Sequence, residues 1–301
     1  MRKISVRVMV SLLLCAMAPA VGAAVDIDTT TRIVYASGPK IQTNIYSIRP
    51  DGTDRWQLTD TRARDWEPAW SPDGTHIAFS STRDGDFEIF VMQADGSKVR
   101  QLTHNTAVDR QPAWAPDGTS IYFISTQECD TSQLHVMRPD GSGRRRISDY
   151  DKHATHPACS PDGTQLAFQL GGINRRSSEK SEIYLRPCAG GALRNLSNHP
   201  AHDKVAAFSP DGQWITFQSF RDGNFELYRM RVDGTGQTRL THEPTKDKRS
   251  SWAPDGSRIC FQGHRSGHWE LYTMRPDGSD VQRITTGTLD SKHPNWSGYL
   301  H

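Results

Sequence analysis

The segment Pro68-Ala69-Trp70-Ser71-Pro72-Asp73-Gly74 decides the fold, because it returns along the chain at nearly constant spacing. Further copies occupy residues 112–118, 157–163, 206–212 and 250–256, and a shortened copy occupies 294–298. The first prolines of the Pro-Asp-Gly turns are separated by 44, 45, 49 and 44 residues. Repetition at a fixed period of this length indicates a series of equivalent structural units.

Each unit contains four short strand patterns. In the unit from 68 to 103 they lie at 68–71, 76–80, 88–92 and 99–103, and turn sequences rich in Asp and Gly separate them. Proline presets φ for a turn, aspartate bonds its own backbone, and glycine adopts positive φ. Four strands per unit at this period predict the blade of a β-propeller.

The two ends of the chain predict how the propeller closes. The chain enters on a second-strand pattern at 32–37 and leaves on a first-strand pattern at 293–297. We therefore expect the C-terminal strand to complete the blade that the N-terminal segment begins, which would leave no free sheet edge at the seam. The sequence predicts an all-β, six-bladed propeller of four-stranded blades.

The N-terminal residues are typical of a secretory signal. Arg2, Lys3 and Arg7 precede an apolar run at 8–17, and Val21-Gly22-Ala23 forms a small-residue cleavage site. The run is shorter than the roughly 20 residues needed to span a bilayer. We expect a signal peptide over 1–23, a single propeller domain over 24–301, no membrane span, and a periplasmic or secreted mature chain. Cys15 leaves a lipoprotein as an alternative, although Leu14 precedes it where the lipoprotein pattern has a small residue.

Charge and motifs narrow the classes of function. The chain has 36 basic and 34 acidic residues, and removing the three cations of the first 23 residues from its net charge of +2 leaves −1. A nearly neutral protein lacks the field that holds a polyanion, so nucleic acid is not an expected partner. The sequence has no Gly-x-Ser-x-Gly, no His-Glu-x-x-His and no phosphate-binding glycine loop, so no catalytic residue is assigned.

The repeats resemble those of one known family. The recurring Pro-Ala-Trp-Ser-Pro-Asp-Gly-Thr, the Ser-x-Arg-Asp-Gly-x-x-Glu motif at 81–88 and 219–226, and Arg-x-Asp-Gly before Leu-Thr are similar to TolB propeller repeats over nearly all of 32–298. The resemblance implies a propeller in the bacterial cell envelope. TolB itself acts in the Tol–Pal system and carries a separate N-terminal domain before its propeller. Only about eight residues lie between the expected cleavage site and the first strand, so we do not expect that domain here. Whether this chain takes part in a Tol–Pal system stays open. Related propellers also accompany prolyl-oligopeptidase-type hydrolase domains.

Connectivity sorts the loops onto two faces. Turns after first and third strands are short and uniform, whereas connections after second and fourth strands vary, and variable loops on a rigid scaffold carry binding residues. The ends of the latter loops should surround the mouth of the axial channel, where an extended, partly acidic peptide could bind. The binding residues expected there are Trp66, Glu67, Arg110, His156, Lys204, Arg249 and His293. Arg175 and Arg176, in an insertion at 171–181, are expected to give partner specificity.

Other residues recur once per unit and are interpreted as structural. Asp65, Asp109, Asp203 and Asp247 form one column, and Arg83, Arg221 and Arg265 form a second column on the same face, which predicts Asp–Arg pairs. Trp70, Trp114, Trp252 and Trp296 should pack between blades, with Cys159 and Phe208 at the same position in the two remaining units.

Histidines support an alternative hypothesis. His153, His156, His199 and His202 lie in consecutive loops, and imidazoles grouped in this way could bind a zinc or manganese ion and assist a lyase or hydrolase reaction. No cofactor is expected otherwise. The pairing of Cys129, Cys159, Cys188 and Cys260 stays open.

Three hypotheses follow. The first is a monomeric, non-catalytic envelope module that binds a protein or peptide at the channel mouth. The second is a metal-assisted propeller enzyme. The third is a structural scaffold within a larger complex.

Overall fold

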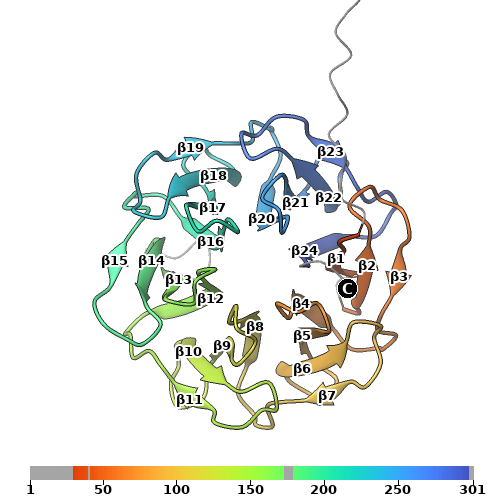
Figure 1. The fold of residues 1–301 in the computed structure, drawn as a ribbon, viewed down its shortest axis with the longest axis vertical. Coiled ribbons are helices and arrows are strands. Elements are labelled where there is room, and N and C mark those ends of the chain that lie inside the picture. The colour runs from red at the N-terminus through yellow and green to blue at the C-terminus, as the bar shows by residue number, and fades with distance from the viewer. Residues whose placement is uncertain (1–29, 40, 173–178, 298–301) are drawn as a thin grey trace, which may run out of the picture.

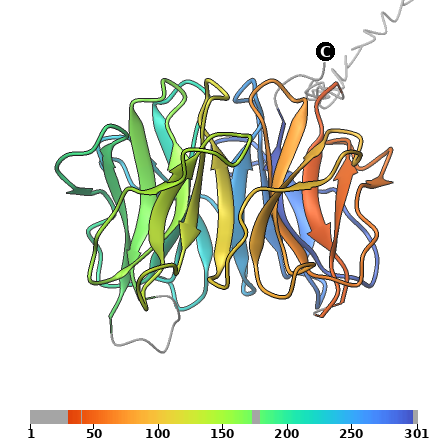
Figure 2. The same ribbon diagram turned by 90° about the horizontal axis from the view of Figure 1, so that it is seen from below.

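The computed structural model describes residues 30–39, 41–172 and 179–297. In these ranges 24 strands form six four-stranded antiparallel sheets, arranged as blades around a central axis (Figure 1). Seen from the side, the blades stand next to one another in a short cylinder (Figure 2). The six-bladed fold predicted from the repeats is confirmed.

The blades are numbered in chain order. Blade 1 contains β24 (Ser291–Trp296), β1 (Ile33–Ser37), β2 (Asn44–Ile48) and β3 (Trp56–Gln57). Blade 2 contains β4 (Asp65–Trp70), β5 (His76–Ser81), β6 (Glu88–Gln93) and β7 (Arg100–Gln101). Blade 3 contains β8 (Asp109–Trp114), β9 (Ile121–Ser125), β10 (Gln133–Met137) and β11 (Arg145–Arg146).

The remaining blades follow the same plan. Blade 4 contains β12 (His153–Cys159), β13 (Gln165–Gly171), β14 (Ser181–Pro187) and β15 (Arg194–Asn195). Blade 5 contains β16 (Asp203–Phe208), β17 (Trp214–Ser219), β18 (Glu226–Arg231) and β19 (Thr238–Arg239). Blade 6 contains β20 (Asp247–Trp252), β21 (Ile259–Gly263), β22 (Glu270–Met274) and β23 (Gln282–Arg283).

The two ends of the described chain meet in blade 1. Strand β24 pairs antiparallel with β1, so that Ile33 lies opposite Trp296 and Ser37 opposite Ser291. The backbone N–H of Ser297 donates to the carbonyl of Arg32, and the N–H of Arg32 donates to Ser297 Oγ. The predicted closure of the ring by the C-terminal strand is therefore confirmed.

The hydrophobic core lies between neighbouring blades. Side chains of a strand alternate between its two faces, so Ile77 and Phe79 of β5 pack against blade 1, while Ala78 of the same strand packs against blade 3. Each second strand places one fully buried aromatic ring at the same position: Tyr35, Phe79, Phe123, Phe168, Phe217 and Phe261. This sixfold core makes the scaffold rigid around the axis.

The tryptophan column also packs between blades, as predicted. Trp114 Nε1 donates to the carbonyl of Ala69 in the preceding blade, and Trp252 Nε1 donates to Thr216 Oγ1. The start of the innermost strands differs from the prediction. The strand pattern at 68–71 predicts a start at Pro68, but β4 begins at Asp65, and the equivalent residues of the other blades also belong to their innermost strands.

Several predictions concern residues outside the described ranges. They are the signal peptide over 1–23, the lipoprotein alternative at Cys15, and the specificity role of Arg175 and Arg176. Within the described ranges, no helix has the length and apolar character needed to cross a membrane.

Candidate functional site

The innermost strands of all six blades share an unusual backbone feature. Each places one non-glycine residue at a positive φ between 51° and 58°. This residue directly follows the last one that pairs with the second strand before the pairing register shifts. These residues are Glu67, Gln111, His156, Val205, Arg249 and His293, and we refer to them as the axial ring. Positive φ is uncommon for residues with a Cβ and is unfavourable above all for a β-branched residue such as Val205.

A β-bulge accompanies every member of the axial ring. In β4 the pairing register with β5 shifts between Trp66 and Ala69, and the other innermost strands show the same shift. A bulge disrupts the ladder locally and redirects a side chain, and bulges are common beside functional sites. The ring residues therefore turn out of the regular strand at the axis, where β4, β8, β12, β16, β20 and β24 lie closest together (Figure 1).

The backbone amides released by the bulges find partners on the preceding blade. The N–H of His156 donates to Gln111 Oε1 at 2.7 Å, that of Arg249 to Gln218 Oε1 at 3.2 Å, and that of His293 to Gln262 Oε1 at 2.8 Å. The N–H of Gln111 donates to Glu67 Oε2 and Ser80 Oγ. Side-chain acceptors thus hold the ring conformation from one blade to the next, which fixes the site before any ligand arrives.

Glu67 is the electrostatic centre of the axial ring. Arg110 donates to both carboxylate oxygens, at 2.9 and 3.2 Å, and Arg249 Nη2 lies 3.9 Å from Oε1. His293 Nδ1 lies 3.9 Å from the same oxygen. One buried carboxylate of blade 2 is therefore shared by two guanidinium groups, one from the adjacent blade 3 and one from blade 6.

Both ring histidines are held neutral by their surroundings. Burial lowers the pKa of His156 well below its usual value, and the charges of Arg249, Arg110 and Lys204 lower it further. Burial likewise lowers the pKa of His293, with Arg249, Arg110, His156 and Lys292 acting in the same direction. At neutral pH these rings are polar but uncharged, and the positive charge of the site comes from arginine and lysine.

The cations near the axis also show the effect of burial. Burial lowers the pKa of Lys204 to about 8, and the charge of Arg249 contributes in the same direction. Burial lowers the pKa of Arg249 to about 10; the charge of Glu67 opposes this shift and that of Arg110 adds to it. The positive charges of Lys204, Arg249 and Arg110 therefore lie close together near the axis, where burial limits their hydration.

Trp66 packs against a ring histidine and two arginines. Its ring stacks on His293 with centroids 5.2 Å apart, and the guanidinium of Arg64 lies 4.2 Å from its centroid. Arg110 covers the same ring at 5.2 Å. Trp66 is half-buried, and its ring contacts link it to His293 of the axial ring and to Arg110.

The axial ring separates two pockets. We call the side with the connections after second and fourth strands the loop face (residues 82–87 and 102–108 in blade 2) and the opposite side the turn face. The turn-face pocket, of about 390 Å³, extends from the ring to Pro72, Pro161 and Pro210 of the Pro-Asp-Gly turns. The loop-face pocket, of about 530 Å³, is lined by residues of blades 3 to 6.

The two pockets collect most of the binding residues expected from the sequence. Glu67, His156, Arg249 and His293 line the turn-face pocket, and Arg110, His156, Lys204 and Arg249 line the loop-face pocket. Sequence reasoning missed Gln169, Gln218 and Gln262 of the second strands, which support or border the ring. Each follows the recurrent buried phenylalanine by one residue, and that position is a signal that could have identified them.

The four histidines of the metal hypothesis are occupied separately. His153 Nδ1 accepts the N–H of Ser132, His199 Nδ1 accepts the N–H of Ala201, and His202 Nδ1 lies 3.1 Å from Ser181 Oγ. His156 lies apart from them in the axial ring, bonded to Gln111. In the part of the chain that the structure describes, no three His, Cys, Asp or Glu side chains come together as a metal site would require.

The four cysteines of the predicted mature chain are free thiols in this structure. Cys159 and Cys188 lie in blade 4 with their Sγ atoms 3.7 Å apart. Cys260 is fully buried in β21, and burial raises the pKa of its thiol.

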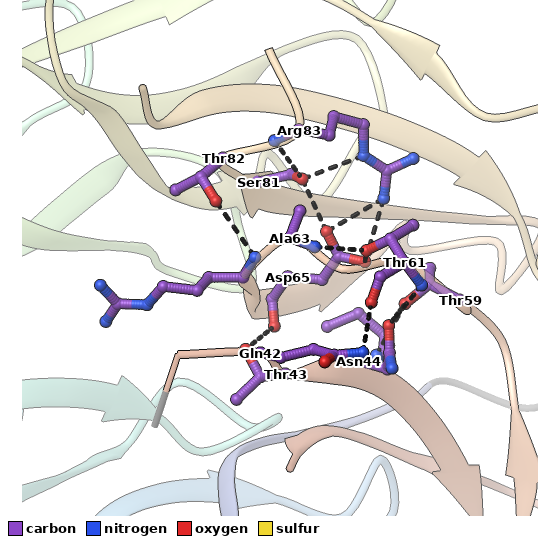
Figure 3. A network of polar contacts seen from close by, with 12 residues as sticks. Gln42, Thr43, Asn44, Thr59, Thr61, Ala63, Asp65, Ser81, Thr82 and Arg83 are labelled. Carbon is purple, nitrogen blue, oxygen red and sulfur yellow. Dashed lines mark hydrogen bonds and ion pairs between the residues drawn. The ribbon is translucent and has the colours of Figure 1, made fainter. Parts of the chain in front are cut away.

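The predicted Asp–Arg pairs are present beneath the loop face. Arg83 Nη2 donates to both carboxylate oxygens of Asp65 at 3.0 Å, and Ser81 Oγ donates to the same carboxylate at 2.6 Å (Figure 3). Arg221 pairs with Asp203 at 3.0 Å and Arg265 with Asp247 at 2.7 Å. These aspartates are fully buried, so the pairs anchor the start of β4, β16 and β20.

Blade 3 meets the same requirement with a different residue. It has no arginine in the Arg83 column, and Arg144 from the connection before β11 pairs with Asp109 at 3.1 Å instead. In blade 4 the aspartate position is Ala154 and its strand partner is Leu170, both buried. The sequence columns did not reveal the role of Arg144, because it comes from a different loop.

Comparison with known proteins agrees with the architecture. The family model of the TolB beta propeller domain matches residues 17–177 and 175–299. A TolB homolog of Chlorobium luteolum is 49% identical over 43 residues, which are 14% of this chain and 10% of that protein. Dipeptidyl-peptidase 5 of Porphyromonas gingivalis is 35% identical over 66 residues, which are 20% of this chain and 10% of that protein. The chain thus spans about a tenth of the length of these curated relatives.

A solved structure of TolB from Acinetobacter baumannii superposes with a TM-score of 0.78 at 19% identity. The match covers 90% of this chain and 67% of that one. At this level of identity the likeness shows the common fold.

Proposed function

The chain belongs to the TolB β-propeller domain family, and from this premise we propose that it is a non-catalytic module of the bacterial cell envelope that binds a protein or peptide partner. The partner would enter the mouth of the axial channel from the loop face. The module would act as a monomer.

The loop-face pocket is the observation that carries this proposal. Four consecutive blades contribute to its wall, and its floor is formed by ring residues whose backbone is already held by hydrogen bonds between blades. Concave sites with a few fixed polar groups are the usual form of a ligand site. A floor fixed in advance reduces the entropy lost on binding.

Photo-cross-linking tests the choice of face. A photoreactive phenylalanine analogue replaces Val108, which lines the loop-face pocket and is 37% exposed. The matched control carries the analogue at Asp117, an exposed residue of a Pro-Asp-Gly turn on the opposite face. After irradiation with the envelope fraction of the source bacterium, we expect a discrete adduct from position 108 that excess unmodified protein suppresses. Adducts from position 117 alone, or from neither position, would contradict the proposal.

The proposed location has a separate test. If export follows the N-terminal signal, protein from the periplasmic fraction should begin near Ala24 and lack the preceding 23 residues. N-terminal sequencing of that fraction measures this directly. A chain that retains Met1, or that is found only with the cytoplasm, would contradict envelope function while leaving the fold unaffected.

A further inference from the structure

The walls of the loop-face pocket carry a strong excess of positive charge. Five cationic side chains line it: Arg110, Lys204, Lys246, Lys248 and Arg249. Among the described residues that line this pocket, none is an aspartate or a glutamate. Glu67 lines the pocket on the other side of the axial ring. The chain as a whole is nearly neutral, so this concentration of charge is a property of the pocket.

The cations are arranged by depth. Lys246 is exposed at the mouth, and Lys248 is half-buried, with its Nζ 4.3 Å from the ring centroid of Phe225. Lys204, at the floor, is 8% exposed. A row of like charges that leads from solvent into a cavity attracts and guides a ligand of opposite charge.

The positive charge at the floor is held at a cost. Burial and the neighbouring Arg249 lower the pKa of Lys204 to about 8, and burial together with Arg110 lowers that of Arg249 to about 10. A buried charge is stabilised when an opposite charge lies within a few ångströms. Glu67 lies 3.9 Å from Arg249 on the other side of the ring, and an anionic ligand in the pocket would add a second negative charge on the loop-face side.

The protein's own carboxylate shows what the floor accepts. Glu67 receives two hydrogen bonds from Arg110 and lies 3.9 Å from Arg249. Guanidinium groups match the planar, two-oxygen geometry of a carboxylate. A ligand carboxylate that reached the loop-face side of these groups would meet the same donors.

Neutral groups in the wall favour a peptide as the source of the carboxylates. Gln169 is 2% exposed, and its Oε1 has no hydrogen-bond partner among the described residues. An amide acceptor of this kind suits the N–H of a peptide backbone. Phe225 and Ile124 supply apolar wall for the aliphatic parts of side chains.

We infer that the loop-face pocket binds an extended acidic peptide segment that presents at least two carboxylates to the cations of blades 3 to 6. The inference rests on the proposed function, because it names the chemistry of the partner at the same site. The inference adds that the pocket selects its ligand by charge and that the ligand is negatively charged.

Fluorescence anisotropy with fluorescein-labelled hexaglutamate tests the selection by charge. Hexaglutamate should bind about tenfold or more tightly than hexaglutamine, and hexalysine should not bind. Raising the salt concentration from about 50 mM to about 500 mM should weaken hexaglutamate binding by about tenfold, because salt screens exposed charges. Equal binding of hexaglutamate and hexaglutamine would overturn the inference.

Paired variants test the location. Lys246→Gln/Lys248→Gln removes two cations from the pocket mouth, and Lys98→Gln/Arg145→Gln removes two exposed cations elsewhere for the same change in net charge. The pocket variant should weaken hexaglutamate binding by about tenfold, and the control by less than about twofold. An equal loss in both would show attraction without a site and overturn the inference. Unchanged near-ultraviolet circular dichroism would verify that both variants are folded.

Two further outcomes separate this inference from the function on which it rests. An acidic oligosaccharide, hexagalacturonate, is measured in parallel; if it binds more tightly than hexaglutamate, the peptide assignment is overturned. If hexaglutamate fails to bind but the cross-link from position 108 forms, the binding function stands and the acidic character of the partner is wrong. If both fail, the proposed function falls as well.

Discussion

Two positions of the innermost strands are equivalent from blade to blade, and they differ in what is repeated. At the start of the strand the residue type recurs, as a buried aspartate in four blades, each paired with an arginine. Two residues later only the backbone conformation recurs, while the side chain changes from Glu67 to Val205 to Arg249. A position that repeats its chemistry serves the fold. A position that repeats its geometry but varies its chemistry is free to serve a ligand.

The largest effect is expected from breaking an aspartate pair. Asp65→Ala removes a fully buried carboxylate and leaves Arg83 and Ser81 without their acceptor. Loss of one partner of a buried pair costs about 3 kcal/mol or more, and because Arg83 remains partly hydrated the lower end of that range applies. Urea denaturation followed by tryptophan fluorescence measures the change in the free energy of unfolding.

Asp51→Ala is the matched control, because Asp51 is exposed in a turn and accepts only local hydrogen bonds from Thr53. It should cost less than about 1 kcal/mol. If both alanine variants lose the same stability, the buried aspartate column has no special structural role, and it does not differ from the axial ring in serving the fold.

The second-largest effect concerns the ring histidines and the pH dependence of the free energy of unfolding. The pKa of His156 and that of His293 are lowered in the folded protein by burial and by Arg110 and Arg249, whereas both histidines can take up a proton when the chain unfolds. Their contribution to stability is therefore complete above about pH 6.5 and is lost as the pH falls. Each should contribute a slope of about 1.4 kcal/mol per pH unit below that value.

The double variant His156→Gln/His293→Gln removes both groups and should reduce the dependence of stability on pH between pH 7 and pH 5. His135, whose pKa burial lowers to about 4, retains its own contribution. Each single variant should remove about half of the difference. Stability curves that keep the wild-type slope in the double variant would show that folding does not change the pKa of these histidines.

The difference between the two positions also explains which features could be predicted from the sequence. Turn chemistry and strand periodicity are properties of residue type at fixed spacing, so the blade number, the closure by β24 and the Asp–Arg pairs could be predicted from the repeats. The axial ring is a backbone conformation adopted by residues such as Val205 and Arg249, whose type gives no sign of positive φ. For that reason the strand pattern at 68–71 does not include residues 65–67, although they belong to β4.

The charge of the loop-face pocket could be predicted from the sequence only in part, for a related reason. Lys204 and Arg249 could be placed at the channel mouth by their position in the repeat. Their crowding, and the absence of an acid from the described wall of the pocket, depend on which side of the ring each side chain faces. The sequence does not encode that choice in any local pattern, since the bulge that redirects the chain is created by pairing with a distant strand.

The smallest effect concerns the cost of the ring geometry. Val205 adopts a φ of 54°, where its branched Cβ is crowded, and asparagine tolerates the same conformation better than other residues. Val205→Asn should therefore stabilise the protein by about 1 kcal/mol. Thermal unfolding followed by circular dichroism measures the gain.

Val205→Ile is the control for this last prediction, because it keeps the branched Cβ and should bring no gain in stability. A gain in the asparagine variant alone would mean that the chain retains an unfavourable residue at a ring position, as expected where selection acts on the ligand rather than on the fold. If both variants leave the unfolding temperature unchanged, the conformation costs nothing at Val205. The variation among ring residues would then reflect weak structural constraint, and only the ligand measurements at the loop-face pocket could assign the ring a role in binding.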